Sequence, residues 1–223
     1  MIVAERKPLA EILANVQNVN KLLVVGCNTC VAVCLAGGEK EVAVLSSALR
    51  IGLRDTNPNI QITQRSIERQ CEEEFNAELA DDIAAHDVVL SMACGVGVQT
   101  LAEQFPTAIV YPALNTTFMG RPEERGVWSE RCMGCGNCVL DKFGGVCPVT
   151  RCSKSLLNGP CGGSENGKCE VDPKNIDCAW QLIYDRMARI GQLDRLLEIE
   201  PAKDWSTSRH GGPRKIVRKD MVL

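Results

Sequence analysis

The chain has 223 residues, of which 45% are hydrophobic, only 4% are aromatic and 13 are cysteines. This length suits one large or two small domains. The net charge of −3 gives no argument for nucleic-acid binding. The sequence contains neither the apolar run of a secretory signal nor that of a membrane span. We therefore expect a cytoplasmic protein, and in a reducing cytosol clustered cysteines more often bind metal or do redox work than form disulfides.

The first half of the chain alternates strand and helix signals. Short apolar runs predict buried strands over residues 21–26, 59–63, 87–92 and 108–111. Apolar residues at helical spacing predict helices over residues 39–50, 72–85 and 98–105. Alternation of this kind implies a parallel sheet with right-handed crossovers. We expect a small, three-layer α/β domain over residues 1–118, with a turn-rich linker over 115–122.

The second half of the chain has little periodicity. Residues 128–178 contain many glycines and cysteines and few apolar residues, which is typical of an irregular module that metal organises. Helices are predicted over 176–190, ended by Gly191, and over 193–199. We therefore expect a cysteine-rich, metal-binding module with C-terminal helices over residues 119–200, followed by a basic, weakly structured tail over 201–223.

Eight cysteines of this module lie close together in the sequence. They are Cys132, Cys135, Cys138, Cys147, Cys152, Cys161, Cys169 and Cys178. The first three are separated by two residues each, and Gly134 and Gly136 let the backbone turn all three sulfurs inward. Cys147 precedes a proline, as in many iron–sulfur ligand loops. Eight thiolates fill two four-ligand sites, either two [4Fe–4S] clusters or one cluster and a zinc site. The spacing leaves open which cysteines share a site.

A second set of cysteines lies in the first half of the chain. Its members are Cys27, Cys30, Cys34, Cys71 and Cys94. Cys27 and Cys94 follow predicted strands, and Cys71 lies between a strand and a helix. Because the carboxyl ends of parallel strands meet at one edge of a sheet, these cysteines can converge there. We expect Cys71, Cys94 and two of the other three to bind a third cluster. The alternative is that several are small buried residues at strand ends.

The cysteines belong to longer motifs that resemble a known family. The cysteine-rich domain associated with the C terminus of methylenetetrahydrofolate reductase is similar to the stretch that contains Gly120-Arg-Pro, Cys132-x-x-Cys135-x-x-Cys138, Cys147-Pro, Gly159-Pro-Cys161-Gly-Gly, Gly167-Lys-Cys169-Glu and Cys178-Ala-Trp180. The small iron–sulfur subunit (MetV type) of the two-subunit enzyme of acetogenic and related bacteria is similar to Cys27-x-x-Cys30-x-x-x-Cys34-x-x-Gly-Gly-Glu39, Arg69-Gln-Cys71-Glu and Ala93-Cys94-Gly-Val-Gly. The resemblance covers about residues 20 to 200.

This resemblance implies a function for the chain. In that family the flavin and the folate lie on a separate catalytic subunit, a TIM barrel of about 200 residues or more, for which this chain has no room. The chain would then be an electron-transfer and assembly subunit that has no catalytic residue of its own. It would pass electrons through two or three [4Fe–4S] clusters to the flavin of the catalytic subunit. That subunit reduces methylenetetrahydrofolate to methyltetrahydrofolate in the Wood–Ljungdahl pathway of one-carbon metabolism.

The resemblance also implies partners and an alternative. The partners would be the flavin-containing catalytic subunit and, as electron donors, further redox subunits or ferredoxin, with no nucleic acid. Related domains in some organisms are described as zinc-binding. The main alternative is therefore a zinc-binding structural subunit of the same enzyme without electron transfer. A stand-alone carrier of the ferredoxin class is a second alternative.

Overall fold

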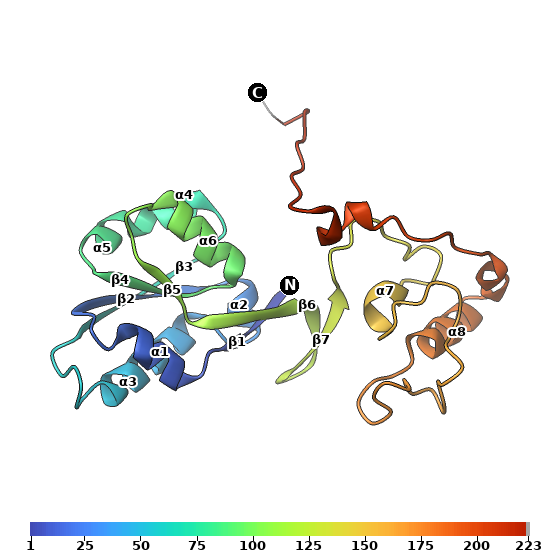
Figure 1. Ribbon diagram of the computed structural model, residues 1–223, viewed down its shortest axis with the longest axis horizontal. Helices are drawn as coiled ribbons and strands as arrows, with labels where there is room; N and C mark the ends of the chain where they lie inside the picture. Colours follow the sequence, from blue (N-terminus) through green and yellow to red (C-terminus); the bar gives the residue numbers. More distant parts are fainter. Residues whose placement is uncertain (222–223) are drawn as a thin grey trace. The chain divides into compact units, whose positions relative to one another are not determined.

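The computed structural model describes residues 1–221 and divides the chain into two compact units (Figure 1). The first unit is Met1–Ser129 and the second begins at Glu130. The prediction of a mixed α/β chain with a parallel sheet and short helices is confirmed. None of the helices in residues 1–221 is long and apolar enough to cross a membrane.

The first unit is built on a four-stranded parallel sheet. Its strands are β2 (Lys21–Cys27), β3 (Gln61–Ile67), β4 (Val88–Met92) and β5 (Val110–Pro112). They lie in the order β3-β2-β4-β5. The chain runs from β2 outward to β3 and then returns past β2 to β4, so the strand order reverses between β2 and β4. In open α/β sheets, ligands bind in the crevice at the carboxyl ends of the strands at such a reversal.

Helices cover both faces of this sheet (Figure 1). They are α1 (Leu9–Val16), α2 (Cys30–Val33), α3 (Glu39–Gly52), α4 (Glu73–Asn76), η1 (Ala77–Leu79), α5 (Ala80–Ala84) and α6 (Gly95–Gln104). Because side chains alternate along a strand, Leu22 and Val24 of β2 pack with α1 and α3 on one face. Leu23 and Val25 pack with η1, α5 and α6 on the other. All four strand residues are fully buried. The continuous apolar run of β2 therefore belongs to a strand that is covered on both sides.

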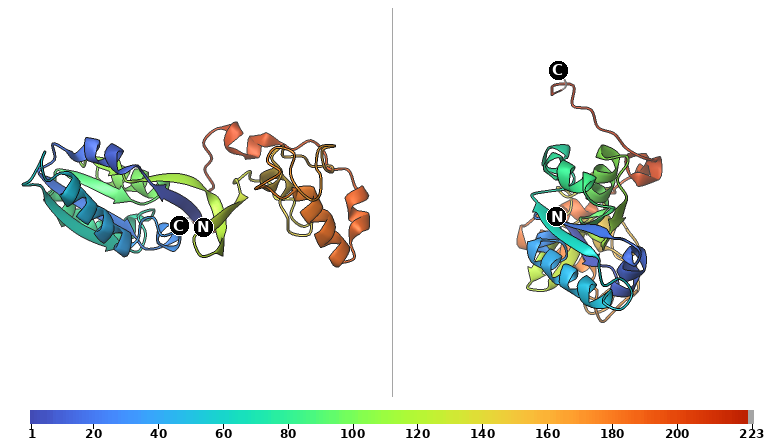
Figure 2. Two further views of the ribbon diagram at one scale, coloured as in Figure 1. Left: turned by 90° about the horizontal axis from the view of Figure 1, so that it is seen from below. Right: turned by 90° about the vertical axis from the view of Figure 1, so that its left-hand side faces the viewer.

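A second, three-stranded sheet lies mainly in the first unit, and its last strand ends in the second. It contains β1 (Ile2–Arg6), β6 (Leu114–Glu124) and β7 (Val127–Cys132), in the order β1-β6-β7. β1 is antiparallel to β6, with Ile2 opposite Met119 (Figure 2). The prediction of a turn-rich linker over residues 115–122 is therefore wrong. This stretch contains Thr and Phe residues that favour strands, and β1 supplies the partner that the sequence analysis did not find.

Several other elements differ from the predicted boundaries. β3 begins at Gln61 and extends to Ile67, later than the predicted strand over 59–63. The helix predicted over 72–85 is divided among α4, η1 and α5. α6 begins three residues earlier than predicted, at Gly95, with Cys94 as its N-cap residue. The last difference brings Cys94 directly to the start of a helix.

The second unit has little regular structure in its described part. Its helices are α7 (Pro148–Arg151), α8 (Ala179–Arg189), η2 (Leu193–Leu197), η3 (Trp205–Thr207) and η4 (Arg209–Gly211). The predicted helix over 176–190 is confirmed as α8, and the predicted helix over 193–199 is the shorter 3₁₀ helix η2. A small apolar core forms where Phe143 meets Trp180, with ring centroids 5.3 Å apart, beside the fully buried Ile183 and Met187.

Candidate metal centres

Three cysteines of the first unit lie together at the carboxyl edge of the parallel sheet. Cys27 is the last residue of β2, Cys94 caps α6 just after β4, and Cys71 lies in the turn after β3. Partial burial raises the pKa of the Cys71 thiol, and the nearby charges of Cys27 and Cys94 raise it further. Neighbouring thiolates are stabilised when a cation binds between them. These three cysteines therefore form the centre of a candidate metal site.

The position of Cys27 depends on two close approaches of the backbone. The Cys27 N–H donates to the carbonyl oxygen of Gly37 at 2.9 Å. A Cβ atom on Gly37 would lie only 2.0 Å from the carbonyl oxygen of Met92. Only glycine therefore lets the chain between β2 and α3 lie directly on the end of β4. This contact joins the end of β2, which carries Cys27, to the end of β4, which leads to Cys94.

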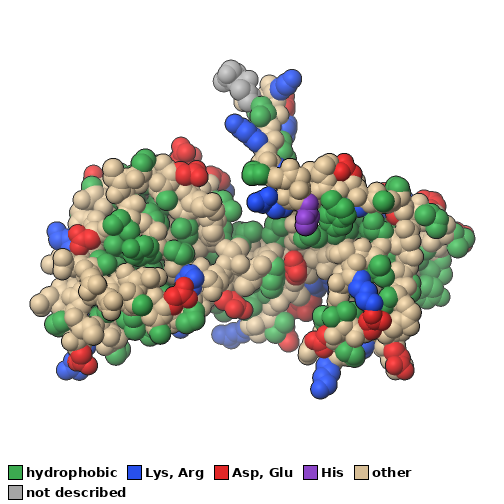
Figure 3. Space-filling view, in the orientation of Figure 1, with side chains coloured by type: hydrophobic (Ala, Val, Ile, Leu, Met, Phe, Trp, Pro, Cys, Tyr) green, Lys and Arg blue, Asp and Glu red, His purple; other side chains and the backbone are tan. Residues whose placement is uncertain are grey.

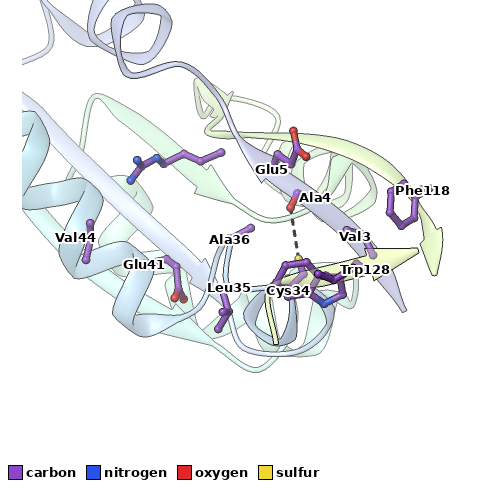
Figure 4. A pocket seen from close by; sticks show the side chains of 13 residues that line it. Val3, Ala4, Glu5, Cys34, Leu35, Ala36, Glu41, Val44, Phe118 and Trp128 are labelled. Atoms are coloured by element: carbon purple, nitrogen blue, oxygen red, sulfur yellow. Dashed lines mark hydrogen bonds between the residues drawn. The ribbon is translucent and has the colours of Figure 1, made fainter. Parts of the chain in front are cut away.

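Cys30 and Cys34 flank the single turn of α2 in the same loop. Cys30 is half-buried at the first residue of the helix. Cys34 is buried, and its thiol donates to the carbonyl oxygen of Ala4 at 3.6 Å (Figure 4). It also donates to the carbonyl oxygen of Val31 at 3.5 Å. Burial raises the pKa of the Cys34 thiol. Cys34 is thus a neutral donor that faces β1, and it lines a pocket there together with Phe118 and Trp128.

In the second unit, the first cysteines form a tight backbone curl. Cys132 ends β7, and its sulfur accepts a hydrogen bond from the Gly134 N–H at 3.3 Å. Gly134 and Gly136 have φ angles of 66° and 84°, in the left-handed region that favours glycine. Cys135 is buried, with its sulfur 3.7 Å from the carbonyl oxygen of Asn137. The glycines therefore supply the tight turn that the sequence predicted, and the inward orientation of all three sulfurs stays a prediction.

Four further cysteines gather around the start of α8. Cys178 caps this helix and shares the apolar core with Cys152. Cys178 also lines a pocket with Cys161. The charges of Cys161 and Cys169 both add to the raised pKa of Lys154, which is raised mainly by its hydrogen bond to Glu170. Cys178 therefore shares a core with Cys152 and a pocket with Cys161, while Cys161 and Cys169 both lie near Lys154.

Hydrogen bonds favour the thiolate form of Cys169. Its sulfur lies 3.3 Å from the Ser153 hydroxyl oxygen. Hydrogen bonds from Ser153 and then from the Val171 backbone lower the pKa of the Cys169 thiol. Hydrogen bonds of this kind favour the charged form, which is the form that binds metal.

The remaining cysteines are Cys138 and Cys147. Cys138 is exposed, six residues after Cys132. Cys147 precedes Pro148 at the start of α7, and its thiol donates to the Thr150 hydroxyl oxygen at 3.6 Å.

The chemistry of the donor set fits a soft metal. All 13 cysteines carry free thiols, and thiolates select zinc and iron–sulfur clusters over hard cations. In the side-chain arrangement of residues 1–221, no three Cys, His, Asp or Glu residues are grouped closely enough to hold a single metal ion. The candidate sites are therefore sets of cysteines that share a sheet edge, a core or a pocket, and metal binding at them stays a prediction.

Three polar residues that contact these cysteines or precede one were missed by the sequence analysis. Gln70 precedes Cys71, and Ser153 and Lys154 follow Cys152. Their only signal in the sequence was their position beside a cysteine. Nothing in that position distinguishes Ser153, which contacts Cys169, from any other serine.

Comparison with known proteins concerns the later part of the chain. A family model described as "Methylene-tetrahydrofolate reductase C terminal" matches residues 111–206. The matched segment contains all eight cysteines of the second unit. No curated protein and no solved structure matches the chain. Residues 111–206 are therefore similar to a domain associated with methylenetetrahydrofolate reductase.

Proposed function

We propose that this chain is the small iron–sulfur subunit (MetV type) of a two-subunit methylenetetrahydrofolate reductase in the cytoplasm. Its role is to conduct electrons from a low-potential donor to the flavin of a separate catalytic subunit, and to assemble with that subunit. The observation that carries this proposal is the grouping of free cysteines at two places: one at the carboxyl edge of a parallel sheet, the other in a segment similar to the reductase-associated domain. When bound, an iron–sulfur cluster accepts and releases single electrons.

In the first unit, Cys27, Cys30, Cys71 and Cys94 would hold one [4Fe–4S] cluster. The nearby charges of Cys27 and Cys94 contribute to the raised pKa of Cys71, and Cys30 is three residues from Cys27. Cys34 is the spare cysteine, because its thiol is buried and already donates to Ala4 and Val31. The N-terminus of α6, a helix of ten residues, begins at this site and would favour the negative charge of the bound thiolates.

In the second unit, the eight cysteines would form two four-thiolate sites. One set would be Cys152, Cys161, Cys169 and Cys178, supported by the core that Cys152 and Cys178 share, the pocket that Cys161 and Cys178 line, and the nearness of Cys161 and Cys169 to Lys154. The other set is then Cys132, Cys135, Cys138 and Cys147. We propose [4Fe–4S] clusters for both sets, with zinc in one of them as the alternative.

The surface near Cys161 and Cys178 is our candidate for contact with the catalytic subunit. Hydrophobic side chains are exposed along α8 and η2 (Figure 3), with Tyr184 53% exposed and Leu197 and Ile199 80% exposed. Tyr184 and Ile199 line the same pocket as the two cysteines. Exposed apolar surface of this kind marks interaction sites, and a docked flavoprotein would lie close to the nearest cluster there. The basic C-terminal tail would add contacts.

A zinc-organised structural subunit is the second candidate function. It is favoured by the small apolar core of the second unit, which is limited to a few residues around Phe143 and Trp180. A unit of this kind needs bound metal to fold, and zinc supplies that stability without redox chemistry.

One experiment separates these functions. The catalytic flavoprotein is purified anaerobically with and without this chain, and iron, zinc and acid-labile sulfide are measured in the complex. Reduced methyl viologen then serves as the low-potential donor, and flavin reduction is followed by absorbance. Electron conduction predicts iron and sulfide in the complex and much faster flavin reduction when this chain is present. Equal rates with and without the chain would contradict it. Stoichiometric zinc without sulfide, together with an unstable isolated flavoprotein, would establish the structural subunit.

A further inference from the structure

The turn that carries Cys71 is held by a buried amide side chain, Gln70. Gln70 directly precedes Cys71 and is 0% exposed. A buried amide is costly unless its polar atoms find partners. A polar residue at this position therefore depends on the hydrogen bonds that its surroundings supply.

The amide of Gln70 bridges the two central strands of the parallel sheet. Its Nε2 donates to the carbonyl oxygen of Val25 in β2 at 3.0 Å. Its Oε1 accepts a hydrogen bond from the Ser91 hydroxyl of β4 at 2.6 Å. Ser91 is itself fully buried, and its Oγ also accepts from the Ala93 N–H at 3.3 Å. The nitrogen and the oxygen of the Gln70 amide are thus hydrogen-bonded to different strands.

The backbone of Gln70 is fixed as well. Its carbonyl oxygen accepts a hydrogen bond from Asn76 Nδ2 of α4 at 3.0 Å, and Asn76 is fully buried. A Cβ atom on Gly97 of α6 would lie 2.9 Å from the Cβ of Gln70. The helix that Cys94 caps therefore packs directly against Gln70, and glycine makes this approach possible.

These contacts connect the three neighbouring cysteines through one residue. Val25 is two residues before Cys27, Ser91 is three residues before Cys94, and Gln70 is bonded to Cys71 itself. β2 and β4 are already paired, with Val25 opposite Ser91. A hydrophobic side chain of similar size could fill the same space, but it could not fix the turn to these two strands by hydrogen bonds. Satisfied buried polar networks rigidify the groups that they join.

We propose that Gln70 and Ser91 are positioning residues that hold Cys71 opposite Cys27 and Cys94 at the metal site. This inference rests on the proposed function for the cluster itself, but the juxtaposition of the three sulfurs can be tested without metal. The sheet fixes the strands that lead to Cys27 and Cys94, the bridge sets the position of Cys71 relative to them, and the thiolates would bind the cluster.

Two variants test the bridge in the full chain. Ser91→Ala removes the donor to Gln70 Oε1 without adding volume, and Gln70→Leu removes the amide while keeping much of its bulk. The control is Asn57→Ala, since Asn57 Nδ2 donates to the Val19 carbonyl oxygen at 2.7 Å at the opposite edge of the sheet. Circular dichroism establishes that each variant is folded. Ser91→Ala keeps the test decisive if Gln70→Leu does not fold.

The first readout is the cluster of the first unit, measured after anaerobic reconstitution with iron and sulfide. Cys94→Ala gives the baseline without that cluster. We expect the iron content in excess of the Cys94→Ala value to be several-fold lower in both bridge variants than in the wild type. The EPR signal of this site, obtained by subtracting the Cys94→Ala spectrum, should also change shape. The control should retain the wild-type iron and signal. Folded bridge variants with wild-type iron and an unchanged signal would overturn the inference.

The second readout needs no metal. The chelated, metal-free full chain is oxidised with diamide, and disulfides that contain Cys71 are mapped by mass spectrometry over time. The wild type and the Asn57→Ala control should form Cys71–Cys27 or Cys71–Cys94 bonds rapidly, and the bridge variants several-fold more slowly. Equal rates in all variants would overturn the positioning role. A wild type that traps these bonds quickly but takes up no iron would contradict the proposed function and leave the bridge supported.

Discussion

The thiol of Cys34 donates a hydrogen bond to the carbonyl oxygen of Ala4, 3.6 Å away, and so ties the loop after β2 to strand β1. A cysteine used in this way is a neutral hydrogen-bond donor, whereas metal ligation requires the thiolate. Because Cys34 is also buried, we propose that it is the structural residue among the five cysteines of the first unit and that the other four are the ligands.

This division predicts opposite results for two substitutions. Cys34→Ser keeps a hydrogen-bond donor beside Ala4 and should leave the iron content unchanged. Cys94→Ala removes a candidate ligand and should lower the iron content by about a third, if three [4Fe–4S] clusters are present. Iron and sulfide analysis of the anaerobically purified chain checks both. Loss of iron in Cys34→Ser, with full iron in Cys94→Ala, would show that the spare cysteine has been misassigned.

The second unit should depend on its metal for folding. Its apolar core is small, so the free energy of metal binding contributes directly to its folding. Cys135→Ser should make residues beyond Glu130 sensitive to limited trypsin digestion, while the first unit stays resistant. Cleavage sites are located by mass spectrometry, with Cys34→Ser as the matched variant. An unchanged digestion pattern would mean that this unit has a sufficient conventional core.

Gly37 should tolerate no side chain. A Cβ atom there would lie 2.0 Å from the Met92 carbonyl oxygen, which is backbone and cannot rotate away. Gly37→Ala should therefore destabilise the first unit by about 1–3 kcal/mol or more. In the control, Gly52→Ala, the new Cβ meets only the flexible end of Leu13, at 2.9 Å, near the end of α3. Its effect should stay within about 1 kcal/mol, since alanine also favours the helix. Urea unfolding of the full chain, followed by circular dichroism, compares the two, and equal midpoints would refute the steric argument.

The loop between Cys169 and Cys178 should loosen in acid. Asp172 accepts hydrogen bonds from the Asn175 side chain at 2.9 Å and from the N–H groups of Lys174 and Asn175 at 3.1 Å. The Asn175 side chain first, and then these backbone groups, lower the pKa of Asp172. A lowered pKa in the folded state stabilises the loop fully above the unfolded pKa of about 3.9, and this stability is lost as the pH falls through the folded value. Carboxyl NMR titration should give a higher Asp172 pKa in Asn175→Ala than in the wild type, and identical values would contradict the assigned cause.

Local patterns in the sequence were sufficient to predict the parallel sheet. The run at Lys21–Cys27 is apolar throughout because both of its faces are covered, and this property is visible in the sequence itself. The end of that strand then places Cys27, by topology, beside the carboxyl ends of its neighbours. The same argument located Cys94.

The contacts that the sequence could not predict are those between distant residues. Ile2 pairs with Met119, and the sequence around either residue does not predict this pairing. In the sequence, nothing distinguishes Gln70 from other polar residues. Its role depends on Val25 and Ser91, which hydrogen-bond to its amide only in the folded chain. Cys34 is distinguished from Cys30 by its burial and by its hydrogen bond to Ala4, a residue on another strand.

The pairing of β1 with β6 also determines the order in which the first unit can be completed. During synthesis β1 emerges early, but Ile2 must wait for Met119. At about 5–20 residues per second, that delay is roughly 6–23 s. Throughout this interval the backbone donors and acceptors of β1 are an open edge, which another chain could pair with. Because the contact is so distant in sequence, closure of this sheet should be among the slowest folding steps of the first unit. The nascent chain therefore depends most on protection from aggregation before β6 has been made.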